Sequence, residues 1–205
     1  MKNGNIDNIF IYWIYFVSII LISIYILESF DFISGLFRED ISYISSIIVS
    51  IFTFYLFRGG YHLYKLRYAI NSLVQENISS KNNIFIDILD EYRSSLSNIS
   101  NKKSFQEQLK SKLYEIVDNG FFVADILLKL GIVGTVIGFI IMLSSLSTID
   151  EMNLSKMNNL LLSMSSGMKV ALYTTLSGLI CSILLTIQNN YFENKINNFI
   201  SKILS

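Results

Sequence analysis

The sequence predicts an all-α, polytopic membrane protein with four transmembrane helices and a helical cytoplasmic segment between the second and third helices. The 205 residues are 52% hydrophobic and only 16% charged, whereas about a quarter of the residues in an ordinary soluble domain are charged. The chain contains no proline, which favours long unbroken helices. Four stretches without Asp, Glu, Lys, Arg or His are long enough to cross a bilayer, and they carry the prediction.

The four uncharged stretches are the predicted membrane spans. A bilayer core needs about 20 apolar residues in a helix, with a range of about 17–25. The stretches contain 19, 17, 20 and 23 residues and are Ile9–Leu27, Ile41–Phe57, Leu130–Ile149 and Val170–Phe192. The first is longer than the apolar part of a signal peptide, about 7–15 residues, and no small-residue cleavage site follows it. We therefore expect it to be an uncleaved span.

Composition also excludes several kinds of partner and site. Sixteen basic residues balance sixteen acidic ones, so no net charge attracts nucleic acid. One cysteine cannot form an internal disulfide, and one histidine cannot build a histidine metal site. We expect no nucleic-acid partner, no bound metal and no cofactor.

The distribution of basic residues predicts the orientation. Ten of the sixteen Lys and Arg residues lie between Arg58 and Lys129, and basic residues collect in cytoplasmic loops. Both termini and the segment between the second and third spans are therefore expected in the cytoplasm. That segment is expected to be helical, with Gly59-Gly60 and Asn119-Gly120 as interruptions and a capping box at Ser104-Phe-Gln-Glu107.

These predictions divide the chain into four parts. Residues 1–58 form a first, peripheral transmembrane pair, and residues 59–121 form the cytoplasmic helical segment. Residues 122–192 form a second transmembrane pair, and residues 193–205 are the cytoplasmic end of the last helix. An apolar stripe at this end is expected to face the cytoplasmic bundle and consists of Phe192, Ile196, Phe199, Ile200 and Ile203.

The second transmembrane pair carries small residues at helical spacing. In lipid no hydrophobic force drives helices together, so small residues mark the places where two backbones approach closely. The predicted packing residues are Gly131, Gly134, Gly138, Gly167, Ala171, Gly178 and Ser182.

Three threonines lie among these small residues. None of the four spans contains a carboxylate, histidine, lysine or arginine, although ion pathways normally need an acid or base in the membrane. If the chain conducts ions, the carboxylate comes from another subunit and the hydroxyls of Thr135, Thr174 and Thr175 line a polar path. The alternative is that each hydroxyl only donates to a carbonyl of its own helix.

Asp125 and Lys129 lie one helical turn apart at the inside end of the third span. One interpretation is a local ion pair between neighbouring turns. The other is a cytoplasmic mouth through which ions reach the second transmembrane pair.

Two segments of this pair resemble the MotA/TolQ/ExbB proton-channel family. They are Leu130-Gly-Ile-Val-Gly-Thr-Val-Ile-Gly138 and Gly167-Met-Lys-Val-Ala-Leu-Tyr-Thr-Thr-Leu-Ser-Gly178. The resemblance covers about residues 125–190. The four-span topology is closest to MotA, and Val170 stands where ExbB and TolQ carry a glutamate, so the subfamily stays open.

The resemblance implies a ring-forming, stator-type subunit of a rotary motor or energy-transducing channel in the bacterial inner membrane. Five copies would surround two copies of a MotB/ExbD/TolR-like partner, whose single span bears an essential aspartate. The pair 122–192 would then line the pore, and Thr135 and Thr175 match family threonines that face the partner. Thr174 looks like the first of a threonine pair typical of sodium-driven stators, although the family default is H⁺ rather than Na⁺.

Two other functions are compatible with the residues alone. The first is a structural scaffold whose small residues only pack helices, without ion conduction. An intramembrane enzyme fits worse, because no span offers a nucleophile beside a base, and Cys181 has no histidine near it in the sequence. We expect the protein not to be an enzyme.

Overall fold

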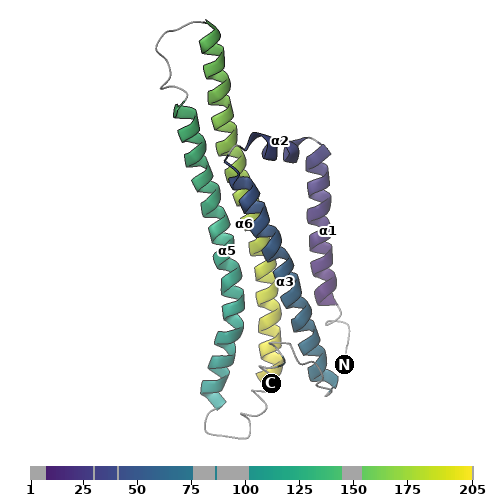
Figure 1. The fold of residues 1–205 in the computed structure, drawn as a ribbon. Helices are drawn as coiled ribbons and strands as arrows, with labels where there is room; N and C mark the ends of the chain where they lie inside the picture. The colour runs from purple at the N-terminus through teal and green to yellow at the C-terminus, as the bar shows by residue number, and fades with distance from the viewer. Residues whose placement is uncertain are drawn as a thin grey trace. The chain divides into compact units, whose positions relative to one another are not determined.

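A computed structural model describes residues 8–29, 31–40, 42–75, 86, 102–144 and 154–204. Within these residues every regular element is an α-helix, which confirms the predicted all-α class. The helices in Figure 1 are α1 (Asn8–Ser29), α2 (Phe32–Glu39), α3 (Ile44–Gln75), α5 (Lys102–Ser144) and α6 (Leu154–Leu204).

Four of these helices are long and apolar enough to cross a membrane, as predicted. The qualifying stretches are Ile11–Ser29, Ile44–Tyr68, Lys110–Ser144 and Leu160–Asn198. α3, α5 and α6 extend well beyond at least one end of their uncharged stretches, because backbone hydrogen bonds continue into polar sequence and no proline ends them, whereas α1 nearly coincides with its stretch. α6 therefore begins at Leu154, before the predicted span, and residues 145–149 of the predicted third span lie outside the described residues.

The two glycine positions expected to interrupt helices do not do so. α3 passes through Gly59 and Gly60, and α5 passes through Asn119 and Gly120. A glycine inside a helix costs about 0.5–1 kcal/mol relative to alanine, and here side chains from other helices fill the space that each glycine leaves. The Trp13 ring of α1, for example, occupies the place that a Cβ on Gly60 would take.

The predicted capping box is also wrong as a helix start. α5 begins at Lys102, so Ser104 lies inside its first turn rather than before it. Helix ends are difficult to predict from sequence alone, because the residues before a capping motif can also adopt helical backbone angles.

The chain forms two compact units. Unit 1 comprises residues 1–18, 55–121 and 186–205, and unit 2 comprises residues 19–54 and 122–185. Each of the four long helices contributes residues to both units. The fully buried side chains of unit 1 include Leu63, Leu66, Leu113 and Ile196, and those of unit 2 include Ile48, Leu127 and Val170.

The end of α6 belongs to unit 1. Phe192, Ile196 and Ile200 of the predicted apolar stripe are all buried there, and the side chains of Phe199 and Ile203 lie outside the described ones. The predicted division of the chain by side of the membrane stays a prediction.

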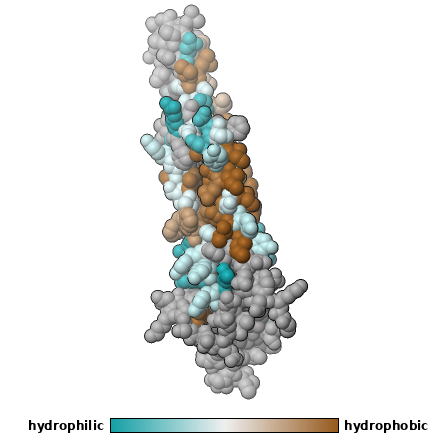
Figure 2. All heavy atoms as spheres, turned by 90° about the vertical axis from the view of Figure 1, so that its right-hand side faces the viewer, coloured by the Kyte–Doolittle hydropathy of each residue, from teal (hydrophilic) through white to brown (hydrophobic). Residues whose placement is uncertain are grey.

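The outer face of α1 is apolar and open. Its exposed large side chains include Leu21 and Tyr25, and Ile20 is its one buried apolar residue among those described. Figure 2 shows hydrophobic side chains gathered on this side of the molecule. In a membrane protein such a face suits lipid or a neighbouring protein.

Asp40 caps the first turn of α3. The carboxylate is buried, its Oδ2 accepts a hydrogen bond from the Ser45 backbone N–H at 2.8 Å, and its Oδ1 accepts one from Ser42 N–H at 3.0 Å. These bonds satisfy amide groups that a helix start otherwise leaves open.

The substitution Asp40→Ala is expected to lower the free energy of unfolding by about 0.5–2 kcal/mol. The backbone N–H groups of Ser42 and Ser45 lose their hydrogen-bond acceptor in this variant. Thermal unfolding of the purified protein measures the change. Ser50→Ala is the matched control, since the exposed Ser50 hydroxyl donates to the Ser46 carbonyl of the same helix. Equal stability of the two variants would contradict the capping role.

Candidate functional site

Helices α5 and α6 meet in unit 2 along a seam of small residues. Gly131 faces Gly178 and Gly138 faces Gly167, so the two helices run antiparallel, side by side in Figure 1. A Cβ added to Gly178 would lie 2.8 Å from the Gly131 Cα, and one added to Gly138 would lie 2.6 Å from the Ala171 backbone nitrogen. These distances are too short for any side chain, so the two backbones are in direct contact.

The structure brings the predicted packing residues together. All of them are buried, and the five glycines among them meet a residue of the opposite helix within this seam. Such close approach increases van der Waals contact between helices, which is a main source of helix association in lipid. Within unit 2, the seam therefore packs α5 and α6 closely against each other.

Thr174 lies inside the seam. The side chain is completely buried and occupies the place that a Cβ on Gly134 would take. Its Oγ1 donates within α6, to the carbonyls of Val170 at 2.9 Å and Ala171 at 3.1 Å. The sequence grouped Thr174 with the partner-facing hydroxyls, but its hydroxyl is not open to a partner in this arrangement.

Thr175 lies at the edge of the seam. It is half-buried, and its Oγ1 lies 3.0 Å from the Ala171 carbonyl and 3.3 Å from the Gly131 carbonyl of α5. The hydroxyl proton is therefore shared between its own helix and the neighbouring one. The oxygen keeps lone pairs that can accept a further hydrogen bond.

Thr135 lies along the same edge. It is one helical turn beyond Gly131, the residue whose carbonyl faces Thr175, and it is also half-buried. Its Oγ1 donates to the Ile132 carbonyl at 2.5 Å. Both hydroxyls thus make the back-bond that was the alternative reading, while their oxygens stay at a partly open edge.

Apolar side chains flank these two threonines. Ile132 and Phe139 lie one turn to either side of Thr135, and Leu172 and Leu179 lie one turn to either side of Thr175; all four are exposed. The two threonines therefore form a narrow polar strip, the threonine edge, on an otherwise apolar surface.

Asp125 and Lys129 form an ion pair near the start of the seam. Lys129 Nζ lies 2.6 Å from Asp125 Oδ2, and more than half of each side chain is exposed. The structure therefore contains the local ion pair that was the first interpretation of these residues. An exposed pair of this kind contributes about 0–1 kcal/mol to stability, and a role as a cytoplasmic mouth stays a prediction.

The seam and the threonine edge fall within one segment that is similar to a known protein family. Residues 122–204 match the MotA/TolQ/ExbB proton channel family. No curated protein and no solved structure matches the chain significantly. The family match confirms the predicted resemblance, extends it to the end of α6, and leaves the subfamily unresolved.

This similarity is to a family of proton channels. Together with four helices that can each cross a bilayer, it indicates a multi-pass membrane protein. All three threonines and all the predicted packing residues lie within the matched range.

Two buried amides on α6 were missed by sequence reasoning. Gln188 and Asn189 are buried within unit 1, and Gln188 Nε2 donates to the Leu56 carbonyl of α3 at 3.1 Å. An amide carries no charge, so these two side chains do not stand out among the uncharged residues of the span. The usable signal was a run of amides, Gln188-Asn189-Asn190, at the end of an apolar stretch.

Proposed function

We propose that the chain is a ring-forming subunit of an ion-driven membrane motor or energy-transducing channel. Five copies surround a dimeric, single-span partner of the MotB/ExbD/TolR kind, which carries the essential membrane aspartate. The threonine edge, Thr135 and Thr175 within a proton-channel family segment, is the observation that carries the proposal. The complex lies in the bacterial inner membrane with both termini in the cytoplasm, and the chain is not an enzyme.

The division of labour between two subunits follows from the side chains available. The four uncharged stretches supply hydroxyls but no acid or base, so the group that binds and releases the ion comes from the partner. A threonine oxygen can hydrogen-bond a water molecule or a carboxylate as the ion passes. Each charge moving down 100 mV releases about 2.3 kcal/mol, so repeated steps drive the work.

The closely packed α5–α6 pair supports this role. Because backbone contact along the glycine seam holds the two helices together, the threonine edge keeps its geometry while an inner partner moves past it. Exposed apolar residues beside the edge, such as Phe139 and Leu172, suit contacts with the partner's helix or with a neighbouring copy. A ring closes only if each copy binds the next at a constant rotation.

The environment of Thr174 favours protons over sodium. A dehydrated sodium ion needs several neutral oxygens to replace its hydration shell. With Thr174 buried in the seam and bonded within α6, only Thr135 and Thr175 of the three candidates stand at the edge. Two hydroxyls suffice to orient water or a carboxylate for proton transfer.

A structural scaffold without ion conduction is the second candidate. It is favoured by the back-bonds of Thr135 and Thr175, because a hydroxyl bonded within its own helix has no need of a partner. The glycine seam fits both functions equally well.

Native mass spectrometry of the complex, extracted gently from its own membrane, tests the proposal. We expect a pentamer that carries two copies of a protein with one apolar span and a membrane aspartate. Protein extracted in the same way from cells that lack the partner gene is the control for chance association. A monomer or dimer without such a protein would contradict the motor function and support the scaffold.

A further inference from the structure

Two adjacent amide side chains of α6 are buried in unit 1 with open hydrogen-bonding atoms. Gln188 is 3% exposed and Asn189 is 7% exposed. Among the described residues, neither Gln188 Oε1 nor Asn189 Nδ2 has a hydrogen-bond partner, although both atoms are fully buried. Buried polar groups in native proteins are paired with protein or with ordered water in the great majority of cases.

Gln188 is held in one orientation by α3. Its Nε2 donates to the Leu56 carbonyl at 3.1 Å, and the same nitrogen occupies the place that a Cβ on Gly59 would take. Turning the amide over would set its oxygen against the Leu56 carbonyl, two acceptors facing each other. The open atom of Gln188 is therefore its oxygen, which can only accept.

Asn189 reaches α5 in the same way. A Cβ on Gly120 would lie 2.5 Å from Asn189 Oδ1 and 2.7 Å from Asn189 Nδ2. Gly59 and Gly120 thus admit one amide each from α6, within a single unit of the fold. This explains why glycines stand in the middle of two unbroken helices.

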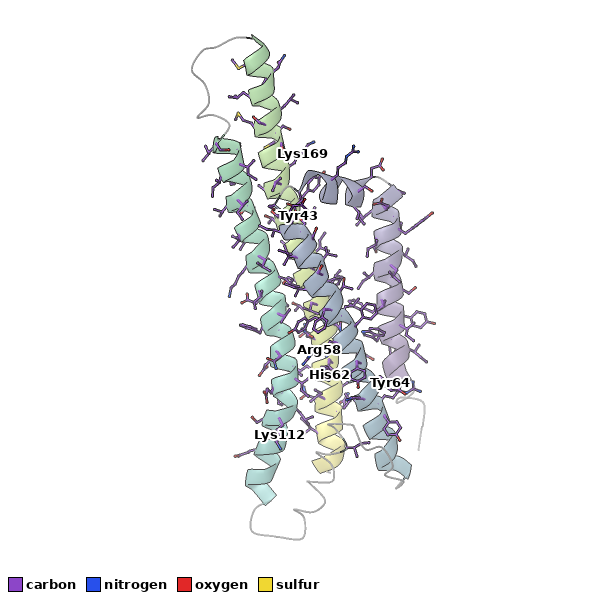
Figure 3. All side chains as sticks on the ribbon, in the orientation of Figure 1. Tyr43, Arg58, His62, Tyr64, Lys112 and Lys169 are labelled. Carbon is purple, nitrogen blue, oxygen red and sulfur yellow. The ribbon has the colours of Figure 1, made fainter. Side chains whose placement is uncertain are left out.

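A third open atom lies one turn further along the same two helices. His62 lies three residues after Gly59 on α3, and Phe192 lies four residues after Gln188 on α6. The centroids of the His62 and Phe192 rings are 6.2 Å apart. His62 Nδ1 is also buried and has no hydrogen-bond partner among the described residues. Figure 3 labels His62 and Arg58 on neighbouring turns of α3.

We propose that Gln188 and Asn189 hold internal water between α3, α5 and α6 of unit 1. A water molecule donates to Gln188 Oε1 and accepts from Asn189 Nδ2, so one species satisfies both atoms. A sodium ion would leave the Asn189 N–H groups facing a cation, and an anion would be repelled by Gln188 Oε1. A second water, about one helical turn or 5.4 Å away, would reach His62 Nδ1.

The water site does not depend on the proposed function, because its support lies in unpaired atoms of unit 1 alone. Internal water of this kind is part of the structure and is costly to remove. If the chain also conducts protons, a water bound between a donor and an acceptor can take up and release one.

Single-particle structure determination of the full-length complex in lipid nanodiscs tests the site directly. In a map that resolves other internal waters, we expect density within hydrogen-bond distance of both Gln188 Oε1 and Asn189 Nδ2. The absence of that density from such a map overturns the proposal. The result leaves the pentamer and its partner, which are measured by mass, unaffected.

The thermal stability of Asn189→Leu is a second test, because Tm is expected to fall if water is bound and to rise if it is not. If water is bound, the substitution removes one of its partners and lowers Tm by at least about 2 °C. If no water is bound, the substitution removes an unpaired buried donor and raises Tm. Asn190→Leu, the same substitution at the exposed neighbouring residue, is the matched control. If Asn189→Leu is more stable than both the control and the wild type, the proposal of bound water is overturned.

Discussion

Replacing Gly138 by alanine is expected to force α5 away from α6 and to lower the free energy of unfolding by about 1–3 kcal/mol. The added Cβ would lie 2.6 Å from the Ala171 nitrogen and 2.7 Å from the Gly167 carbonyl oxygen. Both are backbone atoms, so relief requires a shift of the whole helix. Thermal unfolding of the purified protein, followed by circular dichroism, measures the loss.

Gly35→Ala is the matched control for this variant. Gly35 also lies in a helix of unit 2, but among the described residues a Cβ there would meet only the Tyr173 hydroxyl, at 3.8 Å. Alanine favours the helix by about 1 kcal/mol over glycine, so this variant is expected to be slightly more stable than the wild type. A Gly138→Ala protein as stable as Gly35→Ala would refute direct backbone contact along the seam.

Replacing Thr175 by valine is expected to abolish most ion-driven work while leaving the ring assembled. The variant keeps the shape of the side chain and removes the oxygen at the threonine edge. A hydrogen bond to a charged group is worth about 1.5–3 kcal/mol, which corresponds to roughly a ten- to hundredfold change in rate. Proton flux through proteoliposomes that contain both subunits measures the effect, and native mass spectrometry checks the ring.

Two further variants separate a pore role from helix packing. Thr175→Ser restores the hydroxyl and is expected to recover most of the flux. Thr174→Val removes a buried hydroxyl within the seam and is expected to change stability more than flux. Full flux in both Thr175→Val and Thr135→Val would rule out the threonine edge as an ion path and favour the scaffold.

The sequence predicted the four spans well because a single physical requirement defines them. An uncharged run of about 20 residues has few uses other than crossing a bilayer, and four such runs in one chain left little choice of fold. The ends of the helices were not predicted, because no single physical requirement defines where a helix ends. Asn101 and Asn153 directly precede Lys102 and Leu154 and are of a type that often caps helices, but asparagine is common throughout this chain, so the residue type alone did not single out these two starts.

The glycines of the seam and their contacts were predictable in part. Small residues at helical spacing predict that two helices approach closely in lipid. Gly131, Gly138 and Gly178 do lie against the backbone of the opposite helix. The difference between Thr174 and Thr175 was not predictable. Adjacent residues on a helix point about 100° apart, and only the position of α5 decides which of them enters the seam.

The buried amides illustrate a third kind of limit. Gln188 and Asn189 end an apolar run beside further amides, so nothing in the sequence distinguishes an inward side chain from one at the membrane surface. Their partners, Gly59 and Gly120, stood out in the sequence but suggested breaks in the helices. Only the three-dimensional arrangement joins the two observations.

The contact between Trp13 and Gly60 gives the protein an optical reporter of its own. Trp13 is the single tryptophan of the chain, and its indole lies directly against the backbone of α3. Indole emission shifts with the polarity of its surroundings, so unlabelled protein signals whether α1 is docked. The docking of the first helix can therefore be followed during insertion, assembly and turnover without any added dye.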